Sequence, residues 1–151
     1  MIATKIIEAL QKNAHVILSR GPAPLFAIRV SSAKKRDQSV GACARYFSAA
    51  LESAGFDIAK RPRSAAEYGP FLLSLGFELC DWTPANGIVL VWPRAVNIAS
   101  EHGHVEMQIS AGNEPKEYLS DLARPAKTGV NPWKMGLKYT GLRPHFYRLA
   151  R

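Results

Sequence analysis

The chain lacks the features that mark several large protein classes. Only two of its 151 residues, Cys43 and Cys80, are cysteines, which is too few for a disulfide framework. No stretch is apolar for long enough to cross a bilayer, and no internal repeat or low-complexity segment occurs. Charged residues interrupt the apolar N-terminal segment, which argues against a cleaved secretory signal. We therefore expect a single domain over 1–151, made in the cytoplasm without a signal peptide.

Acidic residues are also scarce. Twelve Asp and Glu residues stand against twenty Lys and Arg, which gives a net charge of +8 and a pI near 9.8. Such a surface attracts polyanions, including nucleic acid, anionic headgroups and the anionic polymers of a bacterial cell wall. The same charge also fits a merely solvated surface. A nucleic-acid-binding module without enzymatic activity is therefore an alternative, but no recognised binding motif accompanies the charge, and nucleic acid is not the expected partner.

Hydrophobic periodicity predicts three helices in the first half of the chain. The first spans about Ala3–Leu18 and ends before Gly21. The second spans Ser39–Gly55 and buries one apolar face. The third begins with Ser64, which forms a capping-box pattern with Glu67, and ends near Leu75.

The second half of the chain has strand patterns. These lie at Phe77–Leu79, Ile88–Trp92, Gly103–Ile109, Tyr118–Leu122 and His145–Leu149. The continuous apolar run from Ile88 suits a central strand that is covered on both faces. Helices followed by strands predict an α+β domain with an antiparallel sheet, and the second helix is expected to pack on that sheet.

Cys43 lies in the first turn of the second helix. A helix N-terminus carries partial positive charge and unpaired N–H groups, which favour the thiolate, the nucleophilic form of a cysteine. The same N–H groups, including that of Cys43 itself, can stabilise an oxyanion. The alternative is that Cys43 packs in the core as a small apolar residue. Cys80 is expected to be a core residue.

Two further residues complete a possible nucleophile, base and orienter. His104 begins a predicted strand, and Asp121 lies near the end of the next one. If the second helix packs beside the His104 strand, the imidazole can accept the thiol proton while Asp121 fixes the ring. Alternatively, His104 is bonded to backbone, and Asp121 caps a turn. Glu106 and Gln108 share a strand face with His104 and are rival orienters.

Neither a metal nor an organic cofactor is expected. His102 and His104 would face the same way in an extended strand, and Cys43 could join them, but no fourth ligand has zinc-like spacing. Several aromatic residues can line a substrate groove or belong to the core. Large aromatics dominate burial, so the core is the simpler expectation for Tyr68, Trp82, Trp92 and Tyr118.

Four segments resemble the cell-wall amidases of the NlpC and CHAP type, which are papain-like cysteine peptidases that cut peptide bonds in peptidoglycan. They are Gly41–Tyr46, Ala50–Gly55, Ile88–Val91 and Gly103–Met107. The resemblance implies a papain-like fold with Cys43 as nucleophile, His104 as general base and Asp121 as the third polar residue.

The small size and the absence of a signal are most similar to the amidase effectors of type VI secretion systems. Membership of that group would imply an antibacterial toxin that acts on peptidoglycan in the periplasm of a target cell and is neutralised by a cognate immunity protein. A small phage lysin is the alternative context. A cysteine peptidase acting on proteins would use the same Cys–His pair and is a further alternative.

Overall fold

The computed structural model describes residues 2–13, 43–94, 103–112, 114–120, 123–125 and 142–150. Helical elements come first and strands follow: α1 (Ile2–Asn13), α3 (Cys43–Ser53), η1 (Ala65–Glu67), α4 (Tyr68–Ser74), β1 (Phe77–Cys80), β2 (Val89–Trp92), β3 (His104–Ala111), β4 (Glu114–Leu119), β5 (Ala123–Pro125) and β6 (His145–Leu149). None of the helices within these ranges has the length and apolar character that a bilayer crossing requires. The α+β prediction is confirmed.

The strands form a six-stranded sheet in the order β1-β6-β2-β3-β4-β5, and every neighbouring pair is antiparallel. β2 lies between β6 and β3 and all four of its residues are buried, so the prediction of a central strand is confirmed. The register places Trp92 opposite His104 and Leu90 opposite Glu106. These four side chains therefore share one face of the sheet.

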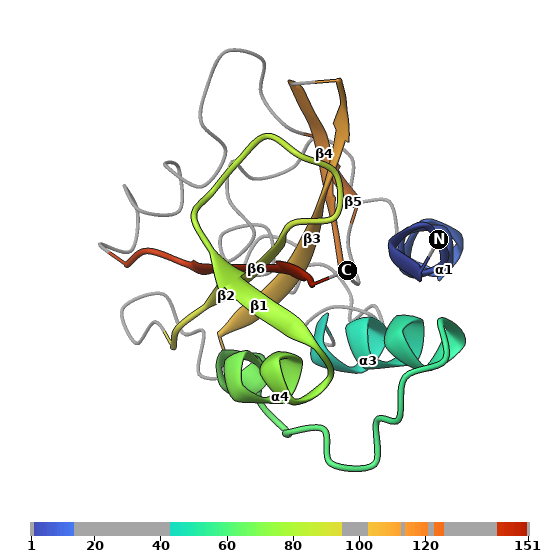
Figure 1. The fold of residues 1–151 in the computed structure, drawn as a ribbon, viewed down its shortest axis with the longest axis vertical. Coiled ribbons are helices and arrows are strands. Elements are labelled where there is room, and N and C mark those ends of the chain that lie inside the picture. Colours follow the sequence, from blue (N-terminus) through green and yellow to red (C-terminus); the bar gives the residue numbers. More distant parts are fainter. Residues whose placement is uncertain are drawn as a thin grey trace, which may run out of the picture.

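The two faces of the sheet carry different contents. Val89, Val91, Val105 and Met107 face the helices and join one large apolar cluster with residues of α1, α3 and α4. In Figure 1, α3 and α4 lie below the sheet, and α1 lies beside α3. α3 packs against β3, as predicted for the helix that carries Cys43. The opposite face holds a second apolar cluster that includes Trp92.

The third helix differs from its prediction at its start. Ser64 makes no side-chain capping bond, and the first turn is the 3-10 helix η1, in which the N–H of Glu67 donates to the carbonyl of Ser64 at 3.0 Å. The Glu67 carboxylate instead lies 3.6 Å from the Arg94 guanidinium. The tight turn leads the chain directly into α4, so a capping box is not formed.

Two other element boundaries differ. The strand predicted from Tyr118 begins at Glu114, because β3 extends to Ala111 and a bulge at Ile109 and Ser110 lets the pairing continue. The first helix is described as far as Asn13, and the end predicted for it at Leu18 lies outside the described residues.

The expectation that Cys80 is a core residue holds in part, because Cys80 packs against the second apolar cluster with Trp82 but is not fully buried. Cys80 is half-buried on the edge strand β1, and its neighbour Leu79 is 59% exposed, because β1 pairs with β6 alone and its end is not covered. Cys43 and Cys80 are both free thiols. The aromatic residues follow the simpler expectation: Tyr68, Trp92 and Tyr118 are buried, and Trp82 is half-buried.

Gly103 fixes the point at which β3 begins. Its φ is +70°, a conformation that side-chain-bearing residues rarely adopt. A Cβ at this position would overlap the carbonyl oxygen of Trp92 and lie 2.8 Å from the Cβ of Ala66 in η1. The absence of a side chain therefore lets η1 approach the start of β3, and His104 follows directly.

We expect Gly103→Ala to be clearly more destabilising than Gly112→Ala. Gly112 also has a positive φ, of +62°, but has open space around it, so alanine there costs only backbone strain of about 1–2 kcal/mol. At position 103 overpacking adds about 1–3 kcal/mol. Urea unfolding of the two variants measures the difference in the free energy of unfolding, and equal losses would show that the contact with Trp92 and Ala66 is easily relieved.

Candidate active site

Cys43 is the first residue of α3, where the sequence placed it, and its side chain is 4% exposed. The first turn of this helix is held from outside. The Tyr68 hydroxyl, at the start of α4, donates to the carbonyl of Ala44 at 2.9 Å. Burial raises the pKa of Tyr68, and negative charge on the nearby Cys43 raises it further. α4 therefore anchors the backbone next to the thiol.

A second set of contacts fixes the same turn. The Ser48 hydroxyl donates to the carbonyl of Arg45 at 3.1 Å, and the Arg61 guanidinium donates to the Ser48 oxygen at 3.0 Å. Arg61 comes from the segment that follows α3, so the chain folds back on its own helix. These bonds leave the first turn little freedom to move relative to the sheet.

His104 is the first residue of β3 and is 1% exposed. Burial by itself lowers the pKa of His104, but negative charge on Cys43, a hydrogen bond with Cys43 and the neighbouring Glu106 raise it from 6.5 to about 10. Since Cys43 acts on His104 in this way, the first residue of α3 lies near the first residue of β3. These contacts favour the charged form of the imidazole.

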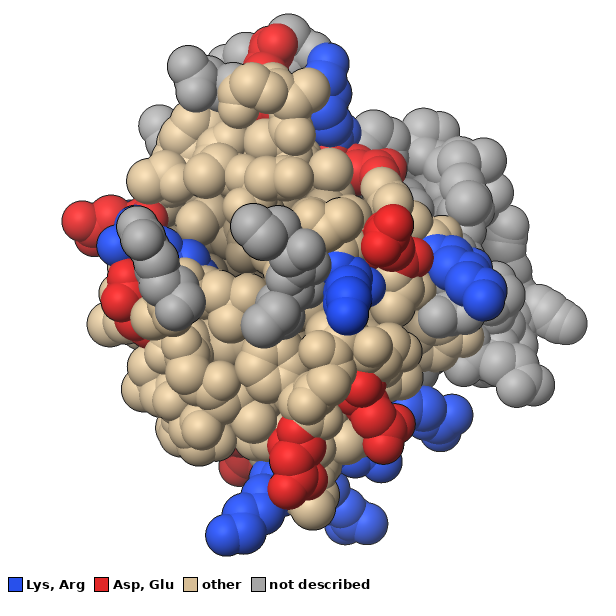
Figure 2. All heavy atoms as spheres, turned by 45° about the vertical axis from the view of Figure 1, so that its right-hand side comes forward, with Lys and Arg blue, Asp and Glu red and all other residues tan. Residues whose placement is uncertain are grey.

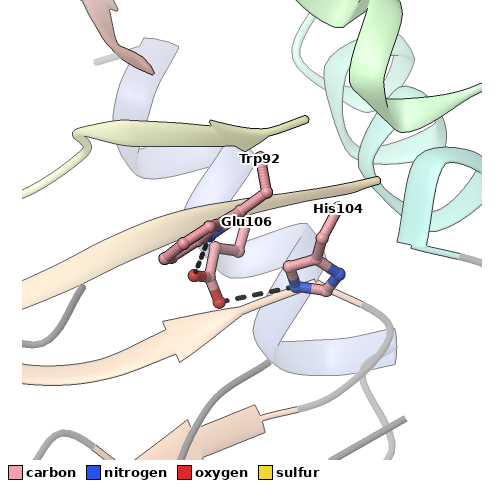
Figure 3. Close-up of polar contacts among 3 residues, drawn as sticks. All are labelled: Trp92, His104 and Glu106. Atoms are coloured by element: carbon pink, nitrogen blue, oxygen red, sulfur yellow. Dashed lines mark hydrogen bonds and ion pairs between the residues drawn. The ribbon is translucent and has the colours of Figure 1, made fainter. Parts of the chain in front are cut away.

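The two ring nitrogens of His104 have different surroundings. Nε2 lies 3.5 Å from Oε1 of Glu106, and Figure 3 shows Nδ1 turned away from that carboxylate. Nδ1 makes no hydrogen bond of good geometry among the described residues. Buried nitrogens without a partner are uncommon in packed interiors, whereas hydrogen bonds in active sites are often long until substrate binds. Cys43 itself is part of the apolar cluster beneath the sheet.

A row of buried polar side chains follows His104 along β3. Glu106 and Gln108 are 2% and 0% exposed. The indole nitrogen of Trp92 donates to Oε2 of Glu106 at 3.2 Å, and that of Trp82 donates to Gln108 at 2.8 Å. The sequence showed that the three polar residues share a face. It did not show the part of Trp92, because its position opposite His104 depends on the strand register.

Two residues considered from the sequence, His102 and Asp121, lie outside the described residues. The role of Asp121 as third polar residue therefore stays a prediction. Within the described ranges, no three His, Cys, Asp or Glu residues are grouped so as to hold a metal ion.

Two hollows on the surface are lined by described residues at β1 and β6. One, of about 520 Å³, includes Trp82 and His145, and the other, of about 570 Å³, includes Glu78 and Arg148. Neither includes Cys43 or His104. The chemical argument for a site therefore comes from the buried pair itself.

Comparison with solved structures gives the one relationship found for this chain. No family model matches the chain, and no curated protein matches it. Its fold is similar to a chain in the crystal structure of the native type VI effector–immunity complex Tae3–Tai3 from Ralstonia pickettii, with 27% identity and a TM-score of 0.55, over 85% of this chain and 99% of that one. The selenomethionine form of the same complex matches with 27% identity and a TM-score of 0.54, over 82% and 99% of the two chains.

The contact between thiol and imidazole predicts an unusual titration. NMR of His104 should show a pKa near 10, and Cys43→Ala should lower it, because the negative charge beside the ring is removed. The Cys80→Ala control should leave the titration of His104 unchanged.

The stability of the fold should also depend on pH through His104. The folded chain keeps the proton of this residue to higher pH than the unfolded chain, whose histidine titrates near 6.5. The free energy of unfolding contributed by His104 should therefore be fully present below about pH 6.5 and be lost as the pH rises towards 10. A histidine that titrates below 6.5 in the wild type would contradict the pairing.

Proposed function

We propose that the chain is a cysteine amidase that cuts an amide bond in peptidoglycan, and that it serves as an antibacterial type VI effector. The observation that carries the proposal is the contact between Cys43, at the N-terminus of α3, and His104, at the start of β3. A nucleophilic thiol beside a histidine base is the arrangement that acyl transfer requires. A helix packed on an antiparallel sheet is the architecture expected of the papain-like NlpC and CHAP amidases.

The chemistry follows from the roles of the two side chains. The Cys43 sulfur attacks the carbonyl carbon of the amide, and the backbone N–H of Cys43 stabilises the oxygen that becomes negative. His104 gives its proton to the amine nitrogen as the C–N bond breaks, which leaves a thioester on Cys43. His104 then accepts a proton from water, whose oxygen attacks the thioester, and the C–S bond breaks to release a carboxylic acid and leave Cys43 as a thiolate beside the protonated His104.

The similarity to the Tae3–Tai3 complex supports the biological setting. The match spans nearly the whole of the related chain at 27% identity, and that complex joins a type VI effector with an immunity protein. By the same reasoning, this chain would be delivered into the periplasm of a target cell and blocked in its producer by a cognate immunity protein. The net charge of +8 would favour contact with an anionic cell wall.

The described residues on one face of the molecule bear on the nucleic-acid alternative. On the face shown in Figure 2, Lys and Arg residues are interspersed with Asp and Glu and do not form a continuous basic stripe. A groove that follows a phosphate backbone would need such a stripe. We therefore retain the amidase as the function that the chain supports best.

Digestion of peptidoglycan tests the activity directly. Purified wild type, Cys43→Ala and Cys80→Ala should be incubated with peptidoglycan fragments and the products analysed by mass spectrometry. New amine and carboxyl ends are expected from wild type and Cys80→Ala, and none from Cys43→Ala, because removal of the nucleophile abolishes thioester formation. Equal activity of Cys43→Ala and wild type would exclude the thiol mechanism, and inertness of all three would argue against peptidoglycan as substrate.

Alkylation tests Cys43 without any substrate. At pH 7, iodoacetamide should modify Cys43 faster than Cys80, because an imidazolium favours the reactive thiolate, whereas burial raises the pKa of the Cys80 thiol. The rates are measured by mass spectrometry of the two cysteine-containing peptides. His104→Ala should slow the reaction at Cys43 and leave Cys80 unchanged. If His104→Ala leaves the rate at Cys43 unchanged, the imidazole does not activate the thiol and the proposal fails.

A further inference from the structure

The imidazole of His104 is held on the side that faces away from the nucleophile helix. Its Nε2 lies 3.5 Å from Oε1 of Glu106, two residues further along β3. Both side chains lie on the same face of the strand and are almost completely buried, at 1% and 2% exposed. A carboxylate in this position can accept a hydrogen bond from the Nε2–H of a neutral or a charged imidazole.

The carboxylate of Glu106 is itself fixed by a neighbouring strand. Its second oxygen, Oε2, accepts a hydrogen bond of 3.2 Å from the indole nitrogen of Trp92 on β2. Trp92 is fully buried, and its indole has one donor only. In Figure 3 the two oxygens point to different partners, one towards the indole and one towards the imidazole. The carboxylate plane is therefore set by Trp92.

The contact between Nε2 of His104 and Glu106 also sets the direction in which Nδ1 of the same ring points. With Nε2–H directed at Glu106, the ring presents Nδ1 on its other edge, where no described residue makes a hydrogen bond of good geometry with it. Among the residues that the structure describes, the titratable groups that act on His104 are Cys43, from α3, and Glu106, from β3. An imidazole held in this way can exchange a proton with the thiol through Nδ1.

The other polar residue on this face is already committed elsewhere. The side-chain oxygen of Gln108 accepts hydrogen bonds from Trp82 at 2.8 Å and Tyr118 at 3.3 Å. Its amide nitrogen donates to the carbonyls of Thr83 and Ala85, both at 2.8 Å. Gln108 thus anchors the segment between β1 and β2, and no contact joins it to His104 among these bonds.

We propose that Glu106, held in place by Trp92, orients the His104 imidazole and takes the role that the family resemblance implied for Asp121. Trp92 is accordingly a positioning residue for the reaction. The inference rests on the proposed function where it concerns catalysis, but the geometry that it asserts exists in the free protein. It can therefore be tested with and without substrate.

The test without substrate follows His104 by NMR in the Cys43→Ala background, where Glu106 is the remaining group that raises its pKa. Glu106→Gln keeps the shape of the side chain and removes its charge. This variant should lower the pKa of His104 by about one unit or more. Trp92→Phe keeps a large apolar ring and removes the donor, and it should lower the pKa in the same direction by a smaller amount. Trp82→Phe removes an equivalent indole bond to Gln108 and should leave His104 unchanged.

The test with substrate compares the same variants with Cys43 intact. Glu106→Gln should reduce kcat about tenfold or more, with little change in KM, and should shift the pH–rate profile. Trp92→Phe should lie between this variant and the wild type, whereas Trp82→Phe should match the wild type. Circular dichroism and thermal unfolding identify any variant that has not folded. If Glu106→Gln is unfolded, the kinetics of Trp92→Phe test the orienting role of Glu106 instead.

The outcomes separate this inference from the proposed function. If Cys43→Ala abolishes activity while Glu106→Gln and Trp92→Phe leave both the His104 titration and the pH profile unchanged, the orienting role of Glu106 is wrong and the amidase proposal stands. If Cys43→Ala retains activity but Glu106→Gln still lowers the pKa of His104, the geometry holds and the catalytic proposal fails. If Trp82→Phe has the same effect as Trp92→Phe, general loosening of the sheet explains both, and the inference is overturned.

Discussion

A charged imidazole in a nearly dry interior is the constraint on which the rest of this molecule depends. Burial opposes protonation of His104, yet its pKa is raised to about 10 because negative groups approach it from two elements. One of these groups, Cys43, reaches the ring only because α3 starts where β3 starts. The other, Glu106, comes from the same strand as the histidine. Loss of both contacts would leave the ring to the opposing effect of burial, which lowers its pKa.

The side chains of β3 alternate between an apolar face and a polar face. Val105 and Met107 pack into the apolar layer beneath the helices, whereas the polar residues that alternate with them point to the other face. Each of the two polar residues after His104 receives a hydrogen bond from a tryptophan: Glu106 from Trp92, and Gln108 from Trp82. Trp92 therefore ties Glu106, the neighbour of His104, to β2, and Trp82 ties Gln108 to the segment between β1 and β2.

Much of this arrangement is predictable from the sequence, for identifiable reasons. The alternation of polar and apolar residues after Gly103 predicts β3 and its two faces. The helical pattern around Cys43 predicts that this residue lies in the first turn of a helix. Both predictions succeed because each depends only on residues that are neighbours in the sequence. The partner of His104 is different. Sequence spacing leaves Asp121, Glu106 and Gln108 as candidates for the residue that orients His104. Only the register of β2 on β3 places the Trp92 indole where it donates a hydrogen bond to Glu106. The turn at Ser64 was misjudged because the capping pattern does not distinguish a 3-10 turn from an α-helical one.

The crowding at the start of β3 also limits how the sequence can vary. Gly103 and Ala66 come from different parts of the chain. A methyl group added at Gly103 would nevertheless overlap the Cβ of Ala66 and the backbone carbonyl oxygen of Trp92. Enlarging either residue would push η1 away from the sheet, and α4 follows η1 directly. The Tyr68 hydroxyl on α4 bonds to the first turn of α3, which carries Cys43. A larger residue at position 66 or 103 would therefore shift the position of Cys43 by displacing η1 and α4. Homologous chains that keep the histidine in this place should therefore keep both positions small together.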